Sequence, residues 1–292
     1  MAWGRPSLRT AQGAVKRALD LGVAPAQTYQ MVTLNVAEHF RLDHLIGSLS
    51  PGKMADIVMI PTPDDFSPQF VMCGGRTIYK DGGNTVAPKK VHFPDTMFQT
   101  VETSDLDLPA LPHTGTVRVM ELVNRLVTQE RFVDLELPAE SADIIMCLAQ
   151  DRLCGGEAFM GLLKGFGLRK GACGTTMCWD TGDMIVVGCD HRSMKTVTER
   201  LRALGGGAVY AIDDEVIEEF PAPLCGIISL NPMEQVAEEV RNLERALRDH
   251  GVPWEKPLLT IDTLGTAAIP HLRITHNGYV RLKDRKLLPL ER

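Results

Sequence analysis

The residues best suited to chemistry lie between positions 164 and 190, in the sequence KGFGLRKGACGTTMCWDTGDMIVVGCD. A polar cluster interrupts the apolar pattern there, and it consists of Trp179, Asp180, Thr181 and Asp183. The β-rich run MIVVG follows at once, so the cluster is expected where a buried strand begins. The preceding glycines suit turns or close backbone approach. If this half of the chain has a pocket, we expect it here.

Trp179, Asp180 and Asp183 are the candidate substrate-proximal residues, with Asp180 the strongest of them. An indole such as that of Trp179 can stack on a flat heterocycle. A second explanation stays open, in which Asp180 is a turn carboxylate that caps backbone N–H groups beside a buried Trp.

Three other patterns have structural explanations that we favour. The spacings between Cys173, Cys178 and Cys189 fit no common zinc site, so buried free thiols are expected. His39 and His44 straddle a predicted helix end, where imidazoles more often cap or lie exposed. KGFGLRKG lacks the Gly-Lys-Ser/Thr ending of a phosphate-binding loop.

Composition limits the class of protein and its partners. The 292 residues are 44% hydrophobic and 23% charged, with a net charge of -6 and a pI near 5.8. This balance is typical of soluble globular proteins and offers no basic surface to nucleic acid or an anionic membrane, so neither is an expected partner. No signal peptide or apolar run of about 18 residues is present. We therefore expect a cytoplasmic chain with reduced cysteines.

Hydrophobic periodicity predicts an α+β chain in two parts. Prolines at 88, 94, 109 and 112 indicate a linker within residues 83–115. The second part is expected to form a mixed, largely antiparallel sheet with flanking helices. Before the linker we predict helices at 7–22, 25–33 and 35–40, a buried strand at 55–60 and a hairpin at 71–80. After it we predict strands at 116–122, 132–137, 142–149, 184–188, 209–212 and 216–220, and helices at 193–204 and 232–250.

Several of these stretches resemble known sequences. KGFGLRKGACGTT, the polar cluster and IVVG together resemble the C-terminal domain of bacterial and archaeal adenine deaminases, which are amidohydrolases. The resemblance continues through ALGGGAVYAIDDEVIEEFPAPLCGIIS at 203–229 and IPHLRIT at 269–275. MVTLNVAEHFRLDHLIGSLSPGKMADIVMI is similar to the segment in which amidohydrolases leave their catalytic barrel and complete a small β-sandwich.

The resemblance implies four parts of the chain. Residues 1–45 correspond to the last helices of an amidohydrolase barrel and residues 46–90 to part of its β-sandwich. Residues 91–115 are the linker and residues 116–292 the C-terminal domain. Without the strands of the catalytic barrel, the chain is expected to be a truncated amidohydrolase.

Two departures from the family pattern fall on polar positions. Where the family usually carries His-Asp-Ser-His-Asn, this chain reads WDTGD at 179–183, so both histidines are replaced and Asp180 is kept. Upstream, the family's Arg-His pair is replaced by Asp151-Arg152.

The resemblance also implies a metal-dependent reaction. Amidohydrolases activate water on zinc, iron or manganese, held by a His-x-His pair, two further histidines and an aspartate. None of the eight histidines here forms a His-x-His pair. We therefore expect no metal ligand, no cofactor and no catalytic residue in this chain. Mn, Fe or Zn would belong to a barrel, and a separate barrel chain is one possible source of it.

The leading hypothesis is an adenine deaminase-like fragment that is inactive without a barrel. The complete enzyme would hydrolyse adenine, a purine-like small molecule, to hypoxanthine and ammonia in purine salvage or catabolism. Two alternatives stay open: a non-catalytic scaffold or partner-binding module, and a hydrolase of another amino-purine or a cyclic amide. Because the helices within 7–40 would pack on barrel elements, their apolar face is expected to drive association, so we expect a homo-oligomer.

Overall fold

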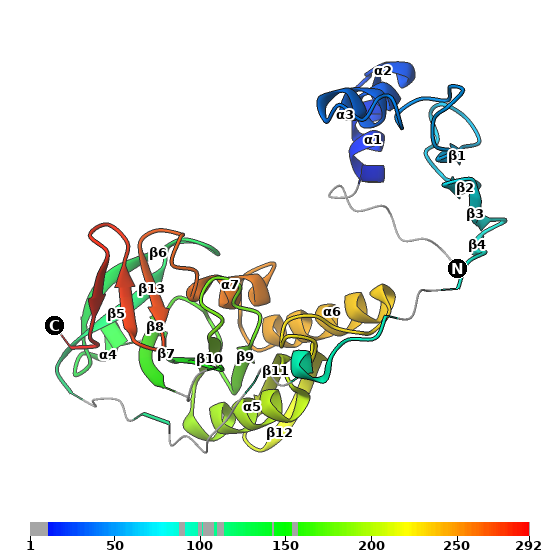
Figure 1. Cartoon of the computed structure of the whole chain (residues 1–292). Helices are drawn as coiled ribbons and strands as arrows, with labels where there is room; N and C mark the ends of the chain where they lie inside the picture. The colour runs from blue at the N-terminus through cyan, green and yellow to red at the C-terminus, as the bar shows by residue number, and fades with distance from the viewer. Residues whose placement is uncertain are drawn as a thin grey trace. The chain divides into compact units, whose positions relative to one another are not determined.

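The computed structural model describes residues 11–87, 91–98, 101, 108–109, 114–141, 143–153 and 157–291. The chain divides into two compact units, unit 1 (Met1–His92) and unit 2 (Phe93–Arg292), and each is described by itself (Figure 1). No helix in the described ranges is long and apolar enough to cross a membrane.

Unit 1 consists of short helices followed by a small antiparallel sheet. The helix predicted at 7–22 is present from Ala11 to Asp20, and residues 7–10 lie outside the described residues. Pro25 starts the second helix, where its missing N–H leaves no donor unsatisfied. The predicted hairpin at 71–80 is confirmed. The elements are α1 (Ala11–Asp20), α2 (Pro25–Val32), α3 (Leu34–His39), β1 (Ile57–Met59), β2 (Phe70–Cys73), β3 (Arg76–Lys80) and β4 (Gly83–Asn84), and the sheet order is β1-β2-β3-β4.

Unit 1 buries little of its apolar surface. Val15, Thr28 and Ala37 are the buried side chains among its described residues. The strand predicted at 55–60 is present as β1, but the prediction that it is buried is wrong, because β1 lies at the edge of the sheet and Val58 is 48% exposed. The apolar residues of this unit therefore lack a second layer within the unit's described part.

Unit 2 is built on an eight-stranded sheet with the order β12-β11-β9-β10-β7-β8-β5-β6. Its neighbouring strands are antiparallel except for the parallel pair β5–β8. The predicted α+β class is confirmed. The strands are β5 (Thr116–Leu122), β6 (Thr128–Asp134), β7 (Ile144–Gln150), β8 (Ala158–Lys164), β9 (Ala172–Thr175), β10 (Met184–Gly188), β11 (Gly207–Ile212) and β12 (Glu215–Pro221).

Helices and a second, three-stranded sheet complete unit 2. The order of the small sheet is β13-β14-β15. The last residues of the chain return to β5, where the Arg118 N–H donates to the Leu290 carbonyl at 2.7 Å. The remaining elements are the 3-10 helix η1 (Asp95–Phe98), α4 (Pro138–Ser141), α5 (His191–Leu204), α6 (Met233–Asp249), α7 (Pro257–Leu264), β13 (Leu272–Thr275), β14 (Gly278–Arg281) and β15 (Lys286–Leu288).

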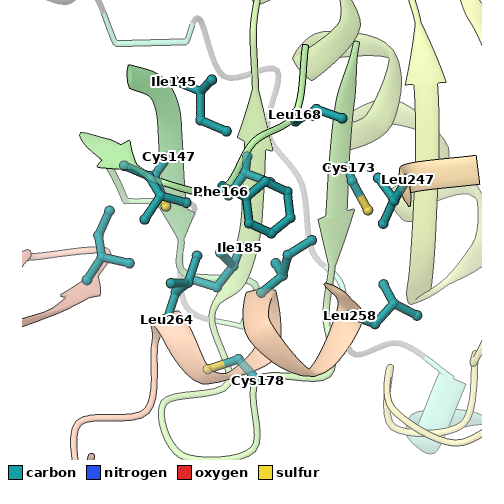
Figure 2. Packing of buried hydrophobic residues seen from close by; sticks show 14 of the residues in the cluster. Ile145, Cys147, Phe166, Leu168, Cys173, Cys178, Ile185, Leu247, Leu258 and Leu264 are labelled. Atoms are coloured by element: carbon teal, nitrogen blue, oxygen red, sulfur yellow. The ribbon is translucent and has the colours of Figure 1, made fainter. Parts of the chain in front are cut away.

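Both faces of the large sheet are covered. On one face Phe166 and Ile185 pack with Leu258 and Leu264 of α7, as Figure 2 shows, and side chains of α6, β13 and β14 join the same cluster. On the other face α5 packs against the sheet. Gly174 permits this close approach, because a Cβ there would lie 2.7 Å from Val197 of α5.

The position of β6 differs from its prediction at 132–137. The strand begins at Thr128, and its first half is polar, which hides the strand pattern in the sequence. These polar residues bond to the neighbouring strand, for example Arg131 to Glu121 at 3.0 Å. Pairing partners on β5 thus stabilise a segment that its own hydrophobic pattern does not reveal.

Candidate functional site

The polar cluster lies on the loop between β9 and β10, two adjacent antiparallel strands. As predicted, it stands immediately before a buried strand, because all five residues of β10 are buried. Both ends of the loop are therefore fixed by the centre of the sheet. This 176–183 loop comprises the residues between Thr175 and Met184.

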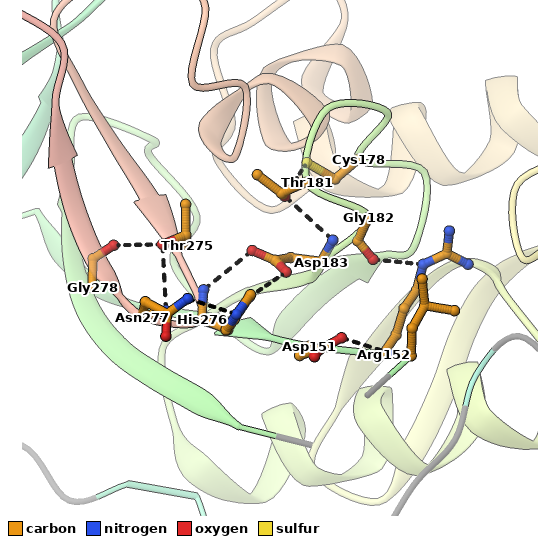
Figure 3. Close-up of polar contacts among 11 residues, drawn as sticks. Asp151, Arg152, Cys178, Thr181, Gly182, Asp183, Thr275, His276, Asn277 and Gly278 are labelled. Atoms are coloured by element: carbon orange, nitrogen blue, oxygen red, sulfur yellow. Dashed lines mark hydrogen bonds and ion pairs between the residues drawn. The ribbon is translucent and has the colours of Figure 1, made fainter. Parts of the chain in front are cut away.

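Asp183 closes the loop at its β10 end and is almost fully buried, with 1% exposure. Its carboxylate accepts two hydrogen bonds from His276, one from Nδ1 at 2.8 Å and one from the backbone N–H at 3.1 Å (Figure 3). Its own backbone N–H donates to the Thr181 hydroxyl at 3.3 Å. Burial raises the pKa of the Asp183 carboxyl, and the hydrogen bonds from His276 act against that rise.

His276 comes from the two-residue turn between β13 and β14. Thr275 shapes this turn, since its hydroxyl accepts from the Asn277 N–H at 3.3 Å and donates to the Gly278 carbonyl at 3.1 Å. His276 Nε2 lies 2.7 Å from the amide nitrogen of Asn277. With Nδ1 donating to Asp183 and Nε2 accepting from Asn277, both ring nitrogens have a partner that suits a neutral imidazole.

Arg152 anchors the loop from the opposite side. Its Nε donates to the Gly182 carbonyl at 2.6 Å and its Nη1 to the Cys225 carbonyl at 2.9 Å. Arg152 is buried, and this burial lowers the pKa of its guanidinium. The substituted Asp151-Arg152 pair of the sequence thus includes a residue that ties the 176–183 loop to the segment after β12.

Trp179 and Asp180 lie at the exposed part of the same loop. Trp179 is 55% exposed, so the explanation that placed a buried Trp here is wrong. Asp180 is exposed, and no side-chain hydrogen bond or ion pair is present for it within the described part of the chain. Their proximity to a substrate stays a prediction.

The geometry gives a loop with fixed ends and two exposed side chains between them. Asp183 and Arg152 hold it through buried contacts, whereas Trp179 offers an aromatic face and Asp180 an acceptor for N–H groups. A flat heterocycle with exocyclic or ring N–H groups matches this pair of groups.

Within the residues that the structure describes, no group of three or more His, Cys, Asp or Glu side chains is placed to hold a metal ion. The donor set of an amidohydrolase metal centre is thus not offered by these residues.

His276 and Asn277 are functional candidates that sequence reasoning missed. The stretch THNG between apolar runs is a recognisable turn signal, which could have located the hairpin. It could not have located Asp183, which is distant in sequence.

A second buried carboxyl, Asp262 on α7, lies beside the end of β9, where its hydrogen-bond partner Thr175 also accepts from the Met177 N–H of the 176–183 loop at 3.0 Å. Its Oδ1 has no hydrogen-bond partner among the described residues. Burial raises its pKa to about 7, against the effect of a hydrogen bond with Thr175, and Glu244 adds to the rise.

Family models match most of both units. The model described as "Adenine deaminase C-terminal domain" matches residues 121–286, more than half of the chain. The chain belongs to the adenine deaminase C-terminal domain family. A second model, "Amidohydrolase family", matches residues 6–78, so the adenine deaminase resemblance is confirmed in unit 2 and the amidohydrolase resemblance in unit 1.

Curated adenine deaminases are similar along nearly the whole chain. The enzyme of Clostridium botulinum (strain Loch Maree / Type A3) is 32% identical over 281 residues, covering 91% of this chain and 47% of its own length. The adenine deaminase of Methanococcoides burtonii is 30% identical over 279 residues, which cover 90% of this chain and 47% of that enzyme. The adenine deaminase of Dehalococcoides mccartyi is 26% identical over 288 residues, which cover 95% of this chain and 50% of that enzyme. The chain therefore spans about half the length of the curated relatives it matches.

Proposed function

We propose that this chain forms part of an adenine deaminase and contributes the 176–183 loop to its purine-binding site. The reaction served is the hydrolysis of adenine to hypoxanthine and ammonia. The names of the curated relatives support this reaction. The observation that carries the proposal is the contrast between the buried anchors Asp183 and Arg152 and the exposed groups Trp179 and Asp180.

Each exposed group has a distinct part in this proposal. Trp179 stacks on the purine ring, an interaction of about 0.5–1.5 kcal/mol beyond area burial. Asp180 accepts a hydrogen bond from the exocyclic amine or from a ring N–H. The anchors fix both groups before the ligand arrives, which lowers the entropy that binding must overcome.

The groups that add water to the purine belong, in this proposal, to a catalytic barrel outside the given sequence. The resident metal of the family, Zn, Fe or Mn, would supply activated water in that barrel. The surface of unit 1 supports such a partner, since it leaves large apolar side chains exposed in the region that matches the amidohydrolase family. These include Leu21, Met31, Val36, Phe40, Leu45, Leu49, Met54, Val58 and Met59.

A chimera tests the proposal. This chain would replace the matching 281-residue region of the Clostridium botulinum enzyme, and hypoxanthine and ammonia formed from adenine would be measured. We expect activity in the parent chimera and at least a tenfold loss of kcat/KM with Asp180→Asn. Asp249→Asn, at an exposed position at the end of α6, is the matched control and should keep the parent rate.

The outcomes separate the two classes of function. A folded but inactive chimera would contradict the proposal and favour the non-catalytic scaffold or partner-binding module. An active chimera that prefers another amino-purine or a cyclic amide would keep the loop assignment and change the substrate.

A further inference from the structure

The start of the 176–183 loop rests on helix α7. The Thr175 hydroxyl, at the end of β9, is a hydrogen-bond partner of the Asp262 carboxyl and also accepts from the Met177 N–H at 3.0 Å. Gly265, which follows α7, makes room for Cys178, since a Cβ on Gly265 would lie 2.6 Å from the Cys178 Sγ. Figure 2 shows Cys178 beside this helix. Two consecutive loop residues therefore depend on how α7 lies against β9.

Asp262 is buried at this contact and incompletely paired. It is 7% exposed, and its Oδ1 has no hydrogen-bond partner among the described residues. A neutral carboxyl tolerates an unpaired oxygen at far lower cost than a carboxylate, whose charge loses its hydration on burial. An ionised Asp262 would therefore be stabilised by any movement that brings water to Oδ1.

No cation within the described part of the chain forms an ion pair with Asp262. The buried Glu244 of α6 acts on Asp262, and Lys256 pairs with Glu244 at 3.1 Å. The buried Arg273 donates to the Thr263 carbonyl of α7 at 2.9 Å, and β10 packs on α7 with apolar residues. Ionisation of Asp262 thus adds an unpaired negative charge beside Glu244. The charged or titratable side chains that reach α7 or Asp262 from the packed segments are Cys173 of β9, Cys178 of the loop, Glu244 of α6, Lys256 before α7 and Arg273 of β13.

We propose that the protonated Asp262 holds the start of the 176–183 loop closed on α7 and that its ionisation releases the loop. In the closed form the carboxyl stays neutral, and Thr175 keeps its contacts with Asp262 and Met177. In the open form water reaches Asp262, and the Met177 N–H loses Thr175 as its acceptor. This pH-dependent switch is a property of the chain itself and does not depend on the purine assignment of the loop.

The transition is expected in the neutral range. Burial raises the pKa of Asp262 to about 7, against the effect of the hydrogen bond with Thr175, so the closed form keeps its proton below that pH. In the open form the pKa returns to about 3.9, the ordinary value of a hydrated aspartate. Each pH unit between about 4 and 7 therefore favours the open form by nearly tenfold, and above that range both forms are ionised and the effect levels off. Because Trp179 and Asp180 lie on the same loop, opening changes how these exposed side chains are presented.

Amide hydrogen exchange of the chain alone, followed by NMR, tests the switch. We expect the protection of the Met177 amide to fall about tenfold between pH 6 and pH 8, after correction for the intrinsic pH dependence of exchange. More than half of this fall should occur below pH 7. The Leu148 amide is the reference for unfolding of unit 2 as a whole, because β7 is paired on both sides within the large sheet.

Three variants locate the switch. Asp262→Asn removes the ionisation and should give equal protection of Met177 at pH 6 and pH 8. Asp249→Asn, at an exposed position at the end of α6, is the matched control and should keep the tenfold fall. Thr175→Val keeps the branched shape without the hydroxyl, so the Met177 amide should exchange at least about tenfold faster than in the parent at pH 6. Thermal unfolding would verify that each variant folds.

Each contrary result overturns the proposal. Unchanged protection of Met177 between pH 6 and pH 8 would show that Asp262 does not control the loop. A tenfold fall that persists in Asp262→Asn would assign the effect to another group, and parent-like exchange in Thr175→Val would remove Thr175 from the connection. Equal protection of Met177 and Leu148 at both pH values would mean that the loop opens only when unit 2 unfolds. The activity of the chimera is a separate result, because these measurements need neither a barrel nor a purine.

Discussion

Unit 1 and unit 2 differ in how their sheets are covered. In unit 2 the eight-stranded sheet has helix α5 on one face and α6, α7 and the β13–β14 hairpin on the other. In unit 1 the four-stranded sheet and three short helices bury Val15, Thr28 and Ala37 among the described residues. Burial of apolar area is the main favourable term in folding. From this difference we predict that unit 2 is the more stable of the two units.

Limited proteolysis should give the largest contrast between the units. We expect cleavage within residues 11–45 at least ten times faster than within unit 2, because segments with few buried contacts open at low free-energy cost. Mass spectrometry of timed digests would locate the first cuts. First cuts inside the sheet of unit 2 would contradict the comparison.

A pair of phenylalanine substitutions should show the same difference between the two units in their free energies of unfolding. Phe166→Ala removes a fully buried ring in unit 2 and should lower the free energy of unfolding by about 3–5 kcal/mol. Phe40→Ala removes a ring that is 65% exposed in unit 1 and should change it by less than about 0.5 kcal/mol. Urea denaturation followed by circular dichroism measures both. Equal effects would mean that Phe40 is covered, for example in an oligomer.

The buried Asp262 should make the stability of unit 2 depend on pH. Its folded-state pKa of about 7 lies above the value of about 3.9 expected in the unfolded chain, so folding favours the protonated form. The stabilisation from this group is present below pH 4 and is lost as the pH rises toward 7. Relative to the parent, Asp262→Asn should therefore gain stability on the order of a few kcal/mol between pH 4 and 8.

Urea titrations of the parent and of Asp262→Asn across that pH range would show whether the stability gained by the variant increases with pH, as expected. A constant difference between the two proteins would show that Asp262 titrates normally. Asp249→Asn, at an exposed position, serves as the control and should track the parent.

The smallest predicted effect concerns ligand selectivity at the 176–183 loop of unit 2. Trp179→His would exchange a stacking surface for a hydrogen-bonding ring. In the chimera, we expect preference for adenine over 2,6-diaminopurine to rise by about 2- to 10-fold, because buried polar groups discriminate better than apolar contact. The ratio of kcat/KM for the two purines measures this. An unchanged ratio would place Trp179 outside the binding site.

Local signals in the sequence predicted several elements of unit 2. Helix α6 was expected at 232–250 and spans Met233–Asp249. Helix α5 was expected at 193–204 and spans His191–Leu204, with Gly205 after it in the left-handed conformation. Pro232 takes the position before α6, and the amide of the preceding Asn231 donates to Glu239 at 3.1 Å rather than capping the helix. For α5 the cap is Asp190, which accepts from the Ser193 N–H at 2.7 Å.

For the candidate site, the sequence predicted the residues that lie close together in the chain but not the contacts between residues that are distant in sequence. The position of Trp179, Asp180 and Asp183 before a buried strand follows from the pattern of one short segment. The pairing of Asp183 with His276 does not, because 93 residues separate them and the contact depends on how the β13–β14 hairpin packs on the sheet. Arg152 was noticed as a substitution, and its hydrogen bonds to Gly182 and Cys225 emerge only in three dimensions.

The return of the chain's last residues to β5 affects how unit 2 can be connected. Val117 pairs with Glu291, so the first strand of the large sheet and the last residues of the chain lie side by side. A short linker could join these two ends, and new termini could then be opened at an exposed turn such as Asp213–Asp214. The closeness of Val117 and Glu291 is the geometry that circular permutation of the large sheet requires.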